Sequence, residues 1–222
     1  MADIYDYKKE YKDLYQPKQK PVLVDVPAMN FIMVDGAGDP NTSAEYQEAV
    51  ELLYGLSYAI KMSKKSDRPP AGYFDYVVLP LEGLWWFKDG DFDGMRQMDK
   101  SKFFWTAMIR QPEFVSEDVF AWAAAELKKK KPGLSVEKAR LEPLTEGLCV
   151  QMMHTGPFDT EPATIAQMEQ FIVSHGYENA ISDPLSSGQI RRHHEIYLND
   201  LRKTAPEKLK TVIRHPVKKS GA

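Results

Sequence analysis

The pattern of hydrophobic and polar positions predicts strands and helices in a repeated order. In the first half of the chain, hydrophobic residues follow a strand period, then recur at helical spacing, and then return to the strand period. These segments are residues 30–36, 42–62, 76–81 and 102–110. Thr42 and Glu45 fit a capping box at the start of the helix, and an acidic loop at residues 88–94 joins the last two strands. The first half therefore predicts strand, helix, strand, strand.

The second half repeats this order. A strand, a helix and two further strands are predicted at residues 148–154, 160–176, 193–199 and 211–217. A helix at residues 116–130 and a strand at residues 139–144 connect the halves. Few identities survive between the halves, so the repeat is one of architecture. It predicts an α+β fold of two strand-helix-strand-strand modules that form an antiparallel sheet, with helices on one face and a ligand cleft between the modules.

The length fits one domain or two small ones, and we expect a single domain at residues 21–222 after an N-terminal arm at residues 1–20. The arm is polar and rich in tyrosine, so we expect it outside the main core. Within the domain, module one covers about residues 21–112, the connector 113–145 and module two 146–218.

Composition narrows the choice of partners. The 29 basic and 32 acidic residues give a net charge of −3, which favours neither nucleic acid nor an anionic membrane. Cys149 is the single cysteine and is expected to be buried rather than nucleophilic. The chain has no hydrophobic segment of membrane-spanning length and no signal-peptide core, so we expect a soluble cytoplasmic protein.

Residues 192–199 are the most informative segment, because their alternation separates two chemically different faces. One face carries His194, Ile196 and Leu198, and the other carries His193, Glu195, Tyr197 and Asn199. We expect the aliphatic face to pack on helices and the other face to form a pocket wall. A glutamate on a strand is also commonly solvated or paired with a neighbouring base, for which Arg191, Arg192 and Arg202 are available.

Aromatic residues gather on the later strands of the first half. Adjacent residues of a strand point to opposite faces, so the pairs Trp85-Trp86 and Phe104-Trp105 each send one ring to the second face. These four residues, together with Tyr76 and His193, are candidate ligand-binding residues. Glu82 is a candidate second acid in the cleft, although a solvated turn glutamate is an equally good interpretation.

No cofactor or metal is expected. His193 and His194 point to opposite faces of a strand and cannot chelate one ion, and the chain contains no helical His-x-x-x-His pair. Residues 36–38 lack the further glycine and the lysine of a phosphate-binding loop.

Four runs of sequence together resemble the stand-alone GyrI-like proteins, which are similar to the effector-binding domains of multidrug-sensing regulators. They are residues 31–41 (FIMVDGAGDPN), 81–86 (LEGLWW), 194–200 (HEIYLND) and 204–214 (TAPEKLKTVIR). The resemblance covers most of the chain from about residue 20. It implies a duplicated strand-helix-strand-strand module that holds small molecules between aromatic side chains and a central glutamate, for which Glu195 is the matching residue.

A subset of that family hydrolyses the cyclopropane of DNA-alkylating natural products, which by this resemblance makes Glu195 and Tyr197 candidate catalytic residues. We therefore expect a site for a hydrophobic aromatic molecule, with hydrolysis of a strained ring as the leading function: Glu195 would act as general base, and Trp85, Trp86 and Trp105 would stack the substrate. A binding module for lipophilic cations, and a gyrase-inhibitor-like regulator, remain alternatives. The sequence leaves open whether the protein forms a homodimer.

Overall fold

The structure is a computed structural model that describes residues 4–66, 69–87, 92, 94–95, 99–200 and 202–221. Of the acidic loop predicted at residues 88–94, only Phe92 and Gly94 lie among the described residues. The helices are α1 (Tyr7–Glu10), α2 (Lys12–Tyr15), α3 (Ala44–Met62), α4 (Glu117–Lys130) and α5 (Glu161–Ser174). The strands are β1 (Val22–Val26), β2 (Met29–Ala37), β3 (Leu81–Phe87), β4 (Phe103–Arg110), β5 (Ala139–Leu144), β6 (Gly147–Thr155), β7 (Tyr177–Asn179), β8 (His193–Tyr197) and β9 (Lys210–Lys219).

Most of the predicted elements are confirmed, with two corrections. The strand expected at residues 76–81 begins only at Leu81, because Pro80 lacks the N–H that a ladder requires. Tyr76 instead forms an isolated bridge with Tyr5. The helix α3 is capped by Ser43 rather than Thr42, and its hydroxyl accepts the backbone N–H of Tyr46 at 3.3 Å.

The sheet confirms the duplicated architecture. Its strand order is β1-β6-β9-β8-β3-β4-β2-β5, with β7 attached to β9, and every pairing is antiparallel. The order β3-β4-β2 of module one is matched by β8-β9-β6 in module two. The two modules are therefore related by a pseudo-twofold axis through the β3–β8 pair, where Gly83 lies opposite Glu195.

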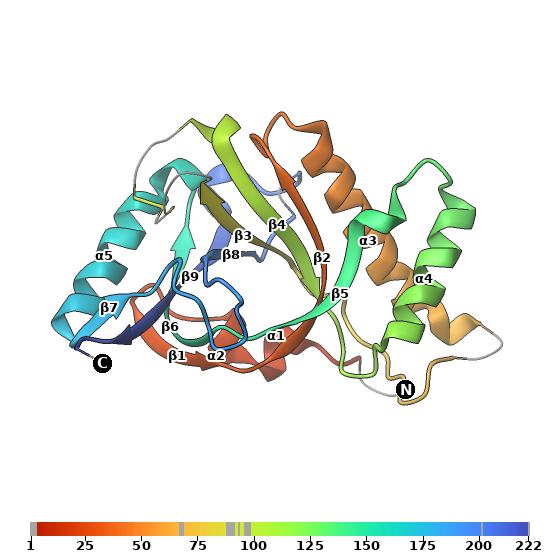
Figure 1. The fold of residues 1–222 in the computed structure, drawn as a ribbon, viewed down its shortest axis with the longest axis horizontal. Helices are drawn as coiled ribbons and strands as arrows, with labels where there is room; N and C mark the ends of the chain where they lie inside the picture. The colour runs from red at the N-terminus through yellow and green to blue at the C-terminus, as the bar shows by residue number, and fades with distance from the viewer. Residues whose placement is uncertain are drawn as a thin grey trace.

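The helices α3 and α5 cover one face of the sheet, each over its own module. Figure 1 shows α5 at the left end of the molecule and α3 right of centre, with α4 beside α3 on its outer side. The pairing register of the strands identifies which face of β8 these helices cover. Ile213 lies opposite Glu195 and packs with Ile165 of α5, while Trp105 shares the same face and contacts Tyr46 of α3. The face that carries Glu195 is thus the one that the long helices α3 and α5 cover. The aliphatic face of β8 is buried as expected, but not against these two helices.

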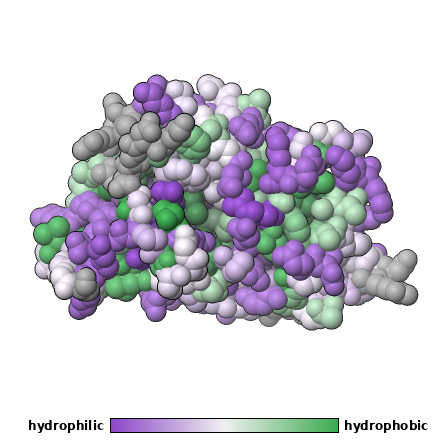
Figure 2. All heavy atoms as spheres, viewed as in Figure 1, coloured by the Kyte–Doolittle hydropathy of each residue, from purple (hydrophilic) through white to green (hydrophobic). Residues whose placement is uncertain are grey.

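The N-terminal segment covers the other face, where the sequence predicted an arm outside the core. Tyr7, Leu14 and Tyr15 are at most 2% exposed and belong to the main hydrophobic core. The backbone oxygen of Leu14 accepts a hydrogen bond from Arg214 at 3.0 Å. Both faces of the central strands are therefore buried. On the outer surface seen in the same view, Figure 2 shows hydrophilic side chains with smaller hydrophobic areas between them.

A buried charged cluster anchors this second face. His194 lies 2.9 Å from Glu146 and 3.0 Å from Glu82, and Glu146 accepts a hydrogen bond from Arg214 at 2.7 Å. Burial lowers the pKa of His194, but Glu146 and Glu82 raise it by more, to about 9. Burial likewise raises the pKa of Glu146, but His194 and Arg214 lower it by more, to about 2. His194 is therefore held as an imidazolium between two carboxylates.

The packing of Trp105 predicts that Gly36→Ala destabilises the fold. A Cβ atom at Gly36 would lie 2.2 Å from the Trp105 ring, so the ring or the strand must shift, which costs about 1–3 kcal/mol of unfolding free energy. Urea unfolding measures this loss. Gly133→Ala is the matched control, because its Cβ would meet no atom within 4 Å. Equal stability of the two variants would contradict the tight packing of Trp105.

The charged cluster predicts a specific dependence of stability on pH. The pKa of His194 is raised from its ordinary value of 6.5 to about 9, so its contribution is complete below pH 6.5 and is lost as pH rises through 9. The unfolding free energy should fall by about 3 kcal/mol over this interval. His194→Gln should flatten that slope, whereas replacing the exposed His175 with Gln should leave it unchanged. An equally steep slope in His194→Gln would show that His194 is not the titrating group.

Candidate functional site

Glu195 lies at the centre of the sheet with a hydrogen-bond donor on each carboxylate oxygen. The Oε1 atom is 2.9 Å from Nε2 of His193, and Oε2 accepts the hydroxyl hydrogen of Tyr197 at 2.8 Å. All three side chains come from β8, because residues two apart on a strand share a face. Glu195 is 8% exposed. The strand thus orients a nearly buried carboxylate with a ring and a phenol of its own.

Trp85 joins this group from the other module. Its indole N–H donates to the Tyr197 hydroxyl at 3.0 Å. Gly83, which lies opposite Glu195, leaves the space for this contact: a Cβ there would be 2.7 Å from the Trp85 nitrogen. The structure therefore brings together four of the predicted site residues, Glu195, Tyr197, His193 and Trp85.

Aromatic side chains surround the carboxylate. Tyr46 of α3 lies 4.9 Å from the ring of Trp105 and 5.9 Å from that of Trp85, and Phe158 lies 5.8 Å from Tyr197. Burial, followed by the charge of Glu195, raises the pKa of both Tyr46 and Tyr197 above the ordinary value. Both phenols remain protonated hydrogen-bond donors at neutral pH.

Sequence reasoning missed Tyr46 and a second acid, Glu161. Tyr46 lies in the helix predicted at residues 42–62, and its helical spacing gives no sign of a role in the site. Glu161 opens α5, a position where an acidic residue ordinarily balances the helix dipole. Glu161 is 6% exposed, and its Oε1 has no hydrogen-bond partner among the described residues. Burial, then the charge of Glu195, raises the pKa of Glu161 well above its ordinary value. A second buried acid therefore lies close enough to Glu195 to respond to its charge.

Three of the predicted ligand-binding residues lie on the opposite face of the sheet. Glu82 lies in the cluster of His194, and Trp86 and Phe104 stack on each other with 6.2 Å between ring centroids. The guanidinium of Arg192 covers Trp86 at 4.8 Å. The predicted division of each aromatic pair between the two faces is confirmed. Tyr76 lies on neither site and packs with Phe74 and Phe114.

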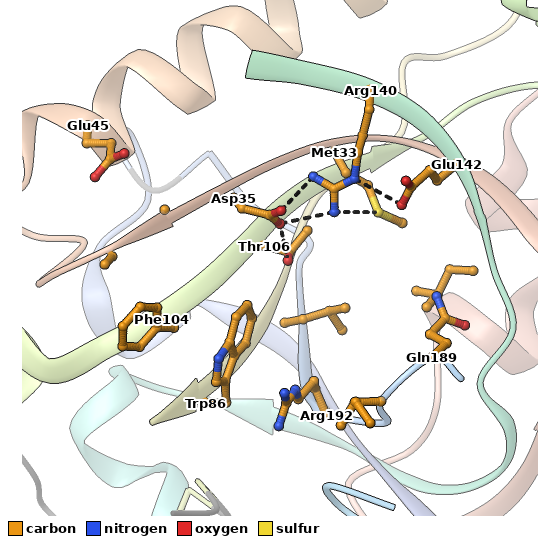
Figure 3. Close-up of a pocket in the computed structure, with 15 residues that line it drawn as sticks. Met33, Asp35, Glu45, Trp86, Phe104, Thr106, Arg140, Glu142, Gln189 and Arg192 are labelled. Carbon is orange, nitrogen blue, oxygen red and sulfur yellow. Dashed lines mark hydrogen bonds and ion pairs between the residues drawn. The ribbon is translucent and has the colours of Figure 1, made fainter. Parts of the chain in front are cut away.

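Trp86 and Phe104 line a groove of about 570 Å³ on this second face (Figure 3). Its opposite wall carries Arg140, which pairs with Asp35 at 2.8 Å and with Glu142 at 2.9 Å. The charged groups of this wall are thus engaged with one another, as the dashed lines of Figure 3 show. The side chains predicted to line one cleft therefore lie on opposite faces of one sheet.

Three further features limit the chemistry of the protein. Among the described residues, none of the helices is long and hydrophobic enough to cross a lipid bilayer. Among the same residues, no group of three or more His, Cys, Asp or Glu side chains is arranged to hold a metal ion. Cys149 is buried, and burial raises the pKa of its thiol.

Solved structures with the same fold include close relatives. A hydrolase from Listeria innocua is 46% identical, with a TM-score of 0.84 over 96% of this chain and 100% of that one. An uncharacterized conserved protein from Listeria innocua is 48% identical, with a TM-score of 0.86 over 96% of this chain and 100% of that one. The EcmrR C-terminal domain is 13% identical with a TM-score of 0.51, over 90% of this chain and 98% of that one, and shows a likeness of fold alone.

No curated protein matches the chain. The family model of the GyrI-like small molecule binding domain matches residues 19–218. That range contains both modules, the β3–β8 pair and every residue around Glu195. The chain belongs to the family of GyrI-like small-molecule-binding domains.

Proposed function

We propose that this protein hydrolyses a strained-ring electrophile, a cyclopropane conjugated with a carbonyl group, at Glu195. The observation that carries the proposal is a nearly buried carboxylate that is hydrogen-bonded by Tyr197 and His193 and surrounded by aromatic rings. Aromatic walls suit a flat hydrophobic molecule, and a carboxylate held in place among them suits general-base catalysis. A relative described as a hydrolase, at 46% identity, adds support.

The reaction would use Glu195 to activate water. The water oxygen bonds to a ring carbon, the strained carbon–carbon bond breaks, and its electron pair moves to the conjugated carbonyl oxygen. Glu195 takes a proton from the water, and the oxygen of the opened product gains a proton from solvent. Glu195 then releases its proton to solvent, so that water and substrate are converted to one hydroxylated product without a further reactant.

Tyr197 would donate its hydrogen bond first to the Glu195 carboxylate and then to the substrate. Its single hydroxyl hydrogen points to Glu195 in this structure. When Glu195 gains a proton, its oxygens become weaker acceptors, so the hydroxyl is free to turn to the oxygen on which charge develops. The N–H of Trp85 holds the phenol in place during this exchange.

Glu195→Gln tests the role of general base. The amide keeps the size of the side chain but cannot accept a proton, so turnover should fall by about two to four orders of magnitude while the melting temperature changes little. Product mass and melting temperature would be measured with a cyclopropyl substrate. If Glu195→Gln turned over substrate at the original rate, Glu195 would not be the general base.

The same geometry supports a second function, which is the binding of a lipophilic cation without turnover. A carboxylate near the rings of Trp85 and Tyr46 offers both charge and aromatic faces to a cation. In that case Glu195→Gln would weaken the binding of a cationic ligand and leave a neutral aromatic ligand nearly unaffected. Measuring both affinities separates this function from hydrolysis.

Trp85 and Trp86 provide a matched pair that tests which face binds ligand. They are neighbours in sequence but lie on opposite faces, one beside Tyr197 and the other in the groove under Arg192. Trp85→Ala should weaken ligand binding by about 1–3 kcal/mol, and Trp86→Ala by less than about 0.5 kcal/mol. Calorimetric titration at a temperature where both variants are folded measures this. The reverse result would assign the ligand to the groove.

A further inference from the structure

Glu195 is one end of a hydrogen-bonded chain of titratable groups that leads out of the site. His193 contacts Glu195 through Nε2 at 2.9 Å and His215 through Nδ1, with 2.7 Å between that atom and Nε2 of His215. His215 in turn lies 3.3 Å from Glu169 through Nδ1. Both rings are fully buried, whereas the Glu169 side chain on α5 is 30% exposed. We call these four residues the proton chain.

Neighbouring groups fix the geometry of the proton chain. Asn179 of β7 donates to the same Glu169 oxygen at 2.7 Å, and the edge of Phe92 lies against the ring of His193, with 5.0 Å between centroids. Burial raises the pKa of Glu169, but its hydrogen bonds to His215 and Asn179 lower it by more. The outer end is therefore a carboxylate that is stable as an anion.

The number of hydrogens in the proton chain determines whether a proton can move along it. Each of its three contacts needs one hydrogen, but two neutral histidines supply only two, because a neutral imidazole carries one N–H. A chain in which all three contacts are hydrogen bonds therefore needs one additional proton. That proton can lie on Glu195, on either ring or on Glu169, and it moves between these places by short shifts along the existing hydrogen bonds.

Several protonatable groups face Glu195 from the elements packed around it. Tyr46 faces Glu195 from α3 and Tyr197 from β8, and Glu161 of α5 is a second acid under the influence of Lys100. A general base must carry its charge before water arrives, so the place of the additional proton decides whether Glu195 can act.

We propose that His193, His215 and Glu169 are positioning residues that keep the additional proton away from Glu195, so that Glu195 is a carboxylate when substrate binds. This rests on the proposed hydrolysis. An imidazolium at either ring is stabilised by Glu169, whose charge reaches the site through His215. Glu169 thus acts on the base through two rings that separate it from Glu195.

The variants Glu169→Gln and His215→Gln test the proposal. The amide oxygen introduced by Glu169→Gln can still accept the hydrogen bonds of His215 and Asn179, but it carries no charge to stabilise an imidazolium. The additional proton should then return to Glu195, and turnover at pH 7 should fall about tenfold, which corresponds to a shift of the acidic limb of the pH profile by about one unit to higher pH. Turnover should recover at higher pH. The matched control is Glu178→Gln, an exposed neighbour on β7 with the same change of charge.

A second measurement does not depend on turnover. The ring-nitrogen chemical shifts of a histidine report which nitrogen carries a proton, so those of His193 should change in Glu169→Gln although these two residues do not touch. If the unaltered protein fails to hydrolyse a cyclopropyl substrate but His193 responds in this way, hydrolysis is wrong and the proton chain stands. The proposal would be overturned if the ring-nitrogen chemical shifts of His193 were the same in Glu169→Gln and the unaltered protein. It would also be overturned if neither variant moved the pH profile.

Discussion

The pairing of β3 with β8 is the interaction on which the rest of the structure depends. It joins two modules of the same strand order into one sheet and places Gly83 of one module opposite Glu195 of the other. A Cβ atom at Gly83 would lie 2.7 Å from the Trp85 nitrogen, so glycine at this position leaves the space for the hydrogen bond from Trp85 to Tyr197. The site is therefore made by the join itself, with residues from both modules.

A single five-residue strand supports two separate polar networks, one on each face. His193, Glu195 and Tyr197 point towards α3 and α5, while His194 points towards the N-terminal segment and forms ion pairs with Glu82 and Glu146. The second network is closed, with a cation between two anions and Arg214 beside them. The first is open at its outer end, where the exposed part of Glu169 meets solvent. This difference separates a network that anchors the fold from one suited to moving a proton.

The aromatic side chains on the two faces of the sheet also have different polar neighbours. Around Glu195, the rings surround an acid whose partners are a phenol and a histidine. In the groove on the other face, Arg192 already covers Trp86, and Arg140 is paired with Asp35 and Glu142. The charges of Arg140, Asp35 and Glu142 in the groove are thus satisfied by each other, whereas the acid on the helix-covered face is held by uncharged or titratable partners.

The sequence by itself determined the local elements, the duplication and the grouping of His193, Glu195 and Tyr197 on one face, because each of these depends on periods that short-range geometry imposes. It also determined that Trp85 and Trp86 point to opposite sides. Only the tertiary structure decided which face the helices cover, since both faces of β8 are buried and alternation cannot distinguish a helix from an N-terminal segment as the covering layer. The same limit explains why Tyr46, Glu161 and the path from Glu195 to Glu169 were not foreseen: they come from elements distant in sequence, and their contacts depend on the packing of α3 and α5 against the sheet.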